Sequence, residues 1–212
     1  MVTPDRVIVA ADAAALAKAA ADRVLARIAA NDGRIAICLT GGSSPRRLYE
    51  LLASETYAAK IPWQRVHWFI GDERFVPPES PLNNMATARR IFLDRFAPPS
   101  HIHPIPTGAA NPNEAAALYE HELKAFHGAA SLDPVRPLFD LVLMGVGPDG
   151  HTASLFPGDR ALHEAERWVV GVGQAPVEPF VPQPSWVRRA VAQEAERLAA
   201  FLGGTLSLNY AG

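Results

Sequence analysis

Asp149 and His151 stand two residues apart in a glycine-rich segment, "GVGPDGHTASLFPG", and together could perform acid–base chemistry. A histidine can accept a proton near neutral pH, and a neighbouring carboxylate can fix its tautomer. The four glycines of the segment allow the backbone to fold tightly around a ligand, and Thr152 and Ser154 add hydroxyl groups. We interpret the segment as a functional loop. The alternative is a turn whose histidine bonds to its own loop.

A second segment, "GDERFVPPESPLNN", places Asp72 and Arg74 directly after an apolar stretch. The guanidinium group of Arg74 could bind a phosphate or a carboxylate through two parallel hydrogen bonds. At least one carboxylate of the Asp-Glu-Arg run is expected to project, with Arg74, into a ligand-binding cleft at the end of the apolar stretch. The alternative is a solvated cluster of charges at the edge of a sheet.

A third segment, "LTGGSSPRRLYELL", interrupts a hydrophobic run with two glycines and two serines. Arg34–Thr40 is predicted to be a buried strand, and Ser44-Pro45 is typical of the N-cap and first position of a helix. The free N–H groups and partial positive charge at a helix start suit a phosphate. The turn lacks the third glycine of the dinucleotide fingerprint and the Gly-Lys-Ser/Thr of a P-loop. A tight turn without a ligand remains the alternative.

The elements that must position these segments alternate along the chain. The predicted strands are Arg6–Ala10, Arg34–Thr40, Val66–Gly71 and Phe139–Gly147, with a short piece at His101–Ile105. The predicted helices are Asp12–Ala30, a segment from Pro45, Asn83–Phe96 and Pro112–His127. This alternation implies a mostly parallel sheet with helices on both faces. Ligands bind beyond the carboxyl ends of such strands, which points to the loops Thr40–Ser44, Asp72–Pro81 and Gly145–Gly158.

The composition indicates a globular protein, with 49% hydrophobic and 20% charged residues and a net charge of −2. We expect no nucleic-acid partner, because the arginines are scattered, and no membrane association, because no apolar run is long enough. The first residues are charged where a signal peptide needs an apolar core, so a cytoplasmic location is expected. The single cysteine, Cys38, lies in an apolar strand and is expected to be buried.

Two other chemistries find little support in the sequence. His101 and His103 could face the same way from a strand, but no third ligand stands at a recognisable spacing, so no metal site is expected. No Gly-x-Ser-x-Gly segment is present, so a serine nucleophile is not expected either.

The three segments together resemble the 6-phosphogluconolactonase family, within a larger group that includes the glucosamine-6-phosphate deaminases. The resemblance covers roughly residues 6 to 173 and implies a Rossmann-like α/β fold. It also implies hydrolysis of 6-phospho-D-glucono-1,5-lactone to 6-phospho-D-gluconate in the pentose phosphate pathway, without metal or organic cofactor. In that case His151 is the general base and Asp149 orients it. The implied substrate-binding residues are Thr40, Gly41, Gly42, Ser43, Ser44, Asp72 and Arg74.

Two alternatives to a lactonase stay open. Deaminases of the larger group usually have a tyrosine where this chain has Arg74, and an Asn-Glu-Pro-Gly run where it has Leu155-Phe156-Pro157-Gly158. Both differences favour the lactonase. The second alternative is a sugar-phosphate-binding protein with reduced or no turnover.

The second alternative rests on the end of the chain. We expect one sugar-phosphate-binding domain over residues 1–212, a monomer or weak homo-oligomer, with an atypical C-terminal segment from about residue 183. Pro176–Pro184 is linker-like, and Pro184–Leu202 is predicted to be an amphipathic helix where the family has further strands.

Overall fold

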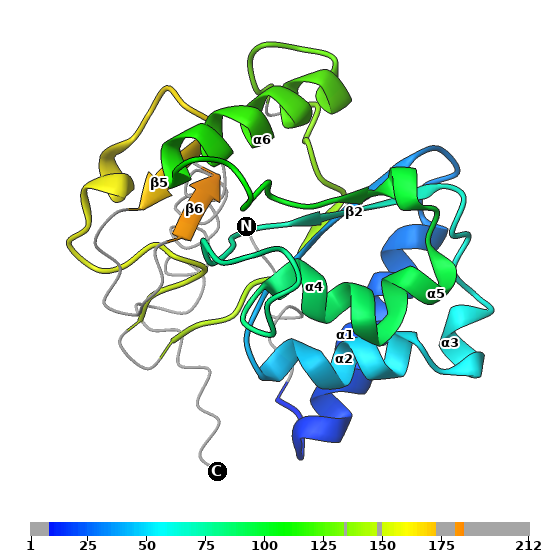
Figure 1. Ribbon diagram of the computed structural model, residues 1–212. Helices are drawn as coiled ribbons and strands as arrows, with labels where there is room; N and C mark the ends of the chain where they lie inside the picture. The colour runs from blue at the N-terminus through cyan, green and yellow to red at the C-terminus, as the bar shows by residue number, and fades with distance from the viewer. Residues whose placement is uncertain (1–8, 134, 148–149, 173–180, 185–212) are drawn as a thin grey trace, which may run out of the picture.

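The computed structural model describes residues 9–133, 135–147, 150–172 and 181–184. Its centre is a sheet of four parallel strands in the order β3-β2-β1-β4, with helices on both faces (Figure 1). The strands are β1 (Ile35–Leu39), β2 (Val66–Ile70), β3 (Ile102–His103) and β4 (Leu141–Val142). The predicted α/β architecture with a mostly parallel sheet is confirmed.

The helices form two layers around this sheet. Figure 1 shows α6 on one face and α1, α2 and α4 on the other. All five residues of β1, including Cys38, are buried between the layers, as expected for a parallel strand covered on both faces. The helical elements are α1 (Ala13–Ala29), α2 (Ser44–Leu52), α3 (Glu55–Ala58), α4 (Asn84–Ala88), η2 (Arg89–Leu93), α5 (Asp94–Phe96), η3 (Pro99–His101), α6 (Pro112–His127) and η4 (Arg160–His163). Within the described part of the chain, no helix has the length and apolarity needed to cross a bilayer.

Side-chain caps explain where three of the predicted helices begin. Asp12, Asn83 and Asn111 each precede a helix and accept a hydrogen bond from the third helical N–H, at 2.7, 2.7 and 3.0 Å. The predicted helix Asn83–Phe96 is continuous through α4, η2 and α5. The prediction for α2 was wrong in detail. This helix begins at Ser44, and the preceding Ser43 has helical backbone angles and makes no side-chain cap.

The predicted strand Phe139–Gly147 is much shorter in the structure. Only Leu141–Val142 forms β4 beside β1, and the Leu143 N–H donates to the Cys38 carbonyl at 2.8 Å. Beyond Leu143 the chain turns back on itself, since the Gly147 N–H donates to the His151 carbonyl at 2.7 Å. The apolar run is therefore longer than the strand because its second half forms a loop.

The two ends of the chain differ from the prediction where they can be compared. Most of the predicted strand Arg6–Ala10 lies outside the described residues, and Val9 and Ala10 form no strand. The linker-like segment ends in a strand, β6 (Val181–Pro184), which pairs antiparallel with β5 (Val169–Val172) next to α6 (Figure 1). Pro184 therefore does not start a helix, and the rest of Pro184–Leu202 lies outside the described residues.

The histidines of the short His101–Ile105 piece lie on different elements. His101 ends η3 and His103 ends β3, because a 3₁₀ turn precedes the strand. Both rings nevertheless stack on His67, with centroids 4.0 and 5.2 Å away, and Nδ1 of His103 lies 2.6 Å from Oε1 of Glu122. Burial, followed by repulsion from His101 and His103, lowers the pKa of His67 to about 4. At neutral pH His67 is therefore uncharged.

Candidate active site

A cavity of about 250 Å³ lies beside the carboxyl ends of β1 and β2. Its wall is formed by the starts of α2 and α4 and by three loops, numbered in chain order: the first loop (residues 40–44), the second loop (residues 72–81) and the third loop (residues 145–158). The lining residues are Thr40, Gly41, Gly42, Ser43, Ser44, Pro45, Asp72, Arg74, Asn84, Gly145, Val146, Gly147, His151 and Ala153. Such a position is the usual ligand site of an open parallel sheet. Every residue predicted for the site lines this cavity except Asp149, which lies outside the described residues.

The first loop depends on its two glycines for different reasons. Gly42 has a φ of +95°, a backbone conformation that residues other than glycine rarely adopt. A Cβ atom on Gly41 would lie 2.1 Å from Oδ1 of Asn84, so this residue must be glycine for Asn84 to approach. Tyr49 of α2 holds the loop, since its hydroxyl accepts from the Thr40 N–H at 3.1 Å and donates to the Thr40 carbonyl at 2.6 Å.

Asp72 connects the second loop to the third loop and to the start of α4. Ser154 Oγ of the third loop donates to Asp72 Oδ2 at 2.8 Å, and Asn84 Nδ2 donates to the Asp72 carbonyl at 3.0 Å. Burial raises the pKa of the Asp72 carboxyl, while Ser154, Arg74 and His151 act in the opposite direction. The carboxylate thus lies in the cavity wall with one oxygen already hydrogen-bonded to a neighbouring loop.

Arg74 supplies the cavity with a cation. Its Nη1 donates to the Leu82 carbonyl at 3.4 Å, and among the described residues it forms no ion pair. Asp72 lies close enough to interact electrostatically with Arg74 but not in an ion pair with it, so the guanidinium can still bind the oxygens of a phosphate.

In the third loop, the His151 ring lies directly against the backbone of Gly147, which has no side chain. A Cβ atom on Gly147 would lie 2.1 Å from Cε1 and 2.2 Å from Nδ1 of His151, so the imidazole occupies the space that any side chain at position 147 would take. The ring also packs on Phe156, with centroids 4.9 Å apart. Ala153 has a φ of +52°, an unfavourable conformation for a residue other than glycine. The third loop is therefore strained at Ala153, two residues after His151.

Sequence reasoning missed two residues of this arrangement. The sequence places Asn84 only in a predicted helix and offers Ser154 only as an available hydroxyl group. Both touch Asp72, although 82 positions separate Ser154 from it in sequence. Spacing along the chain cannot reveal a contact between two loops that only the sheet brings together.

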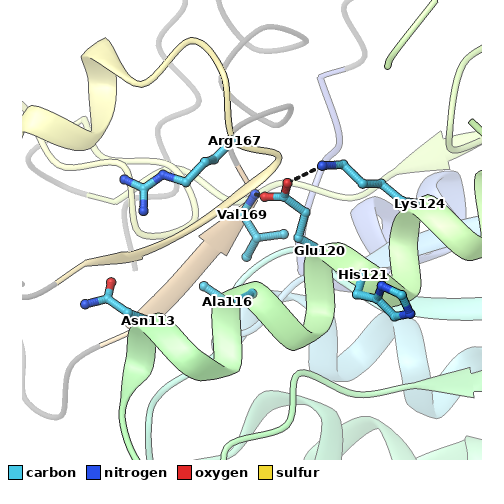
Figure 2. Close-up of a pocket in the computed structure, with 8 residues that line it drawn as sticks. Asn113, Ala116, Glu120, His121, Lys124, Arg167 and Val169 are labelled. Atoms are coloured by element: carbon cyan, nitrogen blue, oxygen red, sulfur yellow. Dashed lines mark hydrogen bonds and ion pairs between the residues drawn. The ribbon is translucent and has the colours of Figure 1, made fainter. Parts of the chain in front are cut away.

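A second hollow, of about 270 Å³, lies between α6 and the segment leading into β5 (Figure 2). Its two cations are paired within the chain: Lys124 with Glu120, and Arg167 with Glu164 at 2.9 Å. Oε2 of Glu120 also accepts the N–H groups of Trp168 and Val169, at 2.8 and 3.1 Å. These contacts fasten β5 to α6, and we assign the hollow a structural role.

Comparisons with known proteins agree with the geometry. A family model described as glucosamine-6-phosphate isomerases/6-phosphogluconolactonase matches residues 11–203. A 6-phosphogluconolactonase from Nostoc sp. is 44% identical over 138 residues, which cover 65% of this chain and 55% of that protein. One from Mycobacterium leprae is 39% identical over 208 residues, which cover 91% of this chain and 82% of that protein. The solved structure of 6-phosphogluconolactonase from Trypanosoma cruzi, 29% identical, has a TM-score of 0.73 and covers 84% of this chain and 73% of that chain.

These matches differ in extent. The chain spans little more than half the length of the Nostoc relative. The family match continues past the three motifs, and it includes the segment from about residue 183 up to residue 203. That this segment is atypical stays a prediction.

Proposed function

Since the chain belongs to the glucosamine-6-phosphate isomerase/6-phosphogluconolactonase family, we propose that it hydrolyses 6-phospho-D-glucono-1,5-lactone to 6-phospho-D-gluconate. The observation that supports this most is the composition of one cavity. It contains a glycine-serine turn at a helix start, a cation that forms no ion pair among the described residues, and a histidine. These are the groups needed to bind a phosphate and to activate water.

His151 is the proposed general base. A δ-lactone is a cyclic ester, so a water molecule must lose a proton as its oxygen attacks C1, and a tetrahedral oxyanion forms. His151 takes that proton and returns it to the ring oxygen when the bond between C1 and this oxygen breaks. Arg74 and the N–H groups of the loops are the two candidates for stabilising the oxyanion. In this proposal Asp149 orients the imidazole.

Thr40–Ser44 and Arg74 are proposed to bind the 6-phosphate, and Asp72 to bind the sugar. The residues from Ser43 to Pro45 line the cavity where α2 begins, and the partial positive charge at the start of a helix favours a bound anion. Asp72 uses Oδ2 for Ser154, which leaves Oδ1 to accept a sugar hydroxyl. Fixing the phosphate far from C1 keeps the ring in place for attack. The three loops belong to one sheet, which supports a single sugar-phosphate-binding domain.

An assay of two products tests this function against its closest alternative. The lactone is supplied with the protein and with 6-phosphogluconate dehydrogenase, and the formation of reduced nicotinamide cofactor is compared with the spontaneous opening of the lactone. In parallel, ammonia release from glucosamine 6-phosphate is measured. We expect acceleration of the first reaction only. Ammonia release without lactone hydrolysis would assign the chain to the deaminases, and binding without either reaction would identify a sugar-phosphate-binding protein.

Replacing Arg74 by alanine is expected to raise KM for the phosphorylated lactone by about 10- to 100-fold, because a hydrogen bond to a charged group contributes about 1.5–3 kcal/mol. KM for the unphosphorylated lactone should change little. Arg89→Ala is the matched control, since Arg89 is exposed, pairs with Asp94 and does not line the cavity. Equal effects of Arg74→Ala on both lactones would contradict the phosphate assignment.

A further inference from the structure

Glu73 stands in sequence between Asp72 and Arg74, which both line the cavity. Its own side chain is completely buried and does not line the cavity. Its oxygens accept three backbone N–H groups. Oε1 accepts from Arg74 at 2.9 Å and from Asn84 at 2.7 Å, and Oε2 accepts from Met85 at 2.9 Å. One side chain therefore binds the backbone of the second loop and the beginning of α4.

The start of α4 depends on this carboxylate. Asn84 and Met85 are the first two residues of the helix and are buried, so their N–H groups need acceptors other than water. Glu73 supplies both, and Asn83 caps the third N–H. The side chain of Asn84 then reaches Asp72 and lies against Gly41, so its position is set from the helix start.

We propose that Glu73 is a positioning residue, whose ionised carboxylate places Arg74 and Asn84 together in the cavity and on which the affinity for a phosphorylated sugar therefore depends. The identity of this ligand rests on the proposed function. The role itself rests on the hydrogen bonds from Arg74 and Asn84, which join two cavity-lining residues of different elements through one buried group. The third hydrogen bond, from Met85, fixes the same group to the start of α4.

Protonation of Glu73 would disturb this arrangement near neutral pH. Burial raises the pKa of its carboxyl to about 7, although the N–H groups of Asn84, Met85 and Arg74 oppose the shift, and Asp72 raises it further. From α6, Tyr119 is the titratable neighbour, and burial keeps it neutral by raising its pKa well above the usual value. A protonated carboxyl presents one O–H donor to N–H groups that need acceptors. Affinity should therefore be complete only well above pH 7, where Glu73 is ionised, and fall as the pH drops through this value.

Glu73→Gln tests the proposal because glutamine has the shape of the protonated acid and does not titrate. The dissociation constant of 6-phosphogluconate is measured by calorimetry from pH 5.5 to 8.5 for the wild-type and variant proteins. The ratio of the two dissociation constants at each pH is used, because the titration of the ligand's own phosphate affects both proteins equally. We expect the variant to bind about tenfold more weakly at pH 8.5, as for one unsatisfied buried N–H, and to bind like the wild type at pH 5.5.

Glu120→Gln is the matched control. Glu120 also accepts two backbone N–H groups, but it does so in the second hollow, between α6 and β5 (Figure 2). This variant should lose thermal stability and keep the wild-type affinity at every pH. A ratio for Glu73→Gln that is the same at all pH values, or equal to one at pH 8.5, would overturn the positioning role.

A second readout needs neither turnover nor a ligand. In the ligand-free wild type, the backbone amide resonances of Arg74, Asn84 and Met85 should titrate together with a midpoint near pH 7, and this titration should be absent from Glu73→Gln. Amides that do not titrate in the wild type would refute the proposal, even where the variant fails to fold. If the wild type neither binds 6-phosphogluconate nor opens the lactone, the proposed function fails, while the amide titration still decides the role of Glu73.

Discussion

Replacing His151 by alanine is expected to lower kcat for the phosphorylated lactone by a factor of about 10² to 10⁴, the usual contribution of a general base. KM should change little, because the proposed phosphate contacts come from the first loop and Arg74. The imidazole lies at the cavity wall and packs on Phe156, so its loss should not disrupt the central sheet.

Steady-state kinetics after subtraction of the spontaneous reaction, together with thermal unfolding, measures this effect. His163→Ala is the control, since His163 is an exposed histidine of η4 that does not line the cavity. An unchanged kcat in His151→Ala would remove this residue from the mechanism. A parallel loss of thermal stability and kcat would instead indicate that the ring only supports its loop.

Substituting alanine for Gly147 is expected to lower kcat by about 10²-fold without removing a chemical group. The added methyl would lie 2.1 Å from the His151 ring, so the imidazole has to leave its position. Displacing a catalytic group by about 1 Å can cost this much in rate. The stability of the fold should change little, because the atoms in the way belong to the end of a side chain that can rotate.

Gly108→Ala is the matched control for this variant. No heavy atom lies within 4 Å of the position of its added methyl, and Gly108 does not line the cavity. Both variants should have nearly the same free energy of unfolding in urea, while only Gly147→Ala loses kcat. A fully active Gly147→Ala would show that the position of the His151 ring is not critical.

The sequence predicted the layers of the fold well because its periodicities match the elements closely. Asn83–Phe96 and Pro112–His127 begin at asparagine caps and contain the expected helices. Phe139–Gly147 was misjudged because hydrophobicity does not distinguish a buried strand from an apolar loop. There, the strand ends at Val142, and the Gly147 N–H donates to the His151 carbonyl within the loop that follows.

The site was predictable to the extent that it lies at the ends of strands. Thr40–Ser44, Asp72, Arg74 and His151 all reach one cavity, because the carboxyl ends of parallel strands meet at one edge. The supporting contacts could not be predicted. Glu73 resembles any acidic residue of a charged run in sequence, and only the three-dimensional fold shows that it is buried under three backbone N–H groups.

The central claim, that this cavity opens a phosphorylated sugar lactone, is tested most directly by one ratio. It is the kcat/KM of the wild-type protein for 6-phospho-D-glucono-1,5-lactone divided by that for the unphosphorylated lactone, each corrected for spontaneous opening. Binding energy from a remote phosphate contact should appear in this ratio, and two or three charge-assisted hydrogen bonds give a preference of at least about 100-fold. Equal values for the two lactones, or no acceleration of either, would contradict the account.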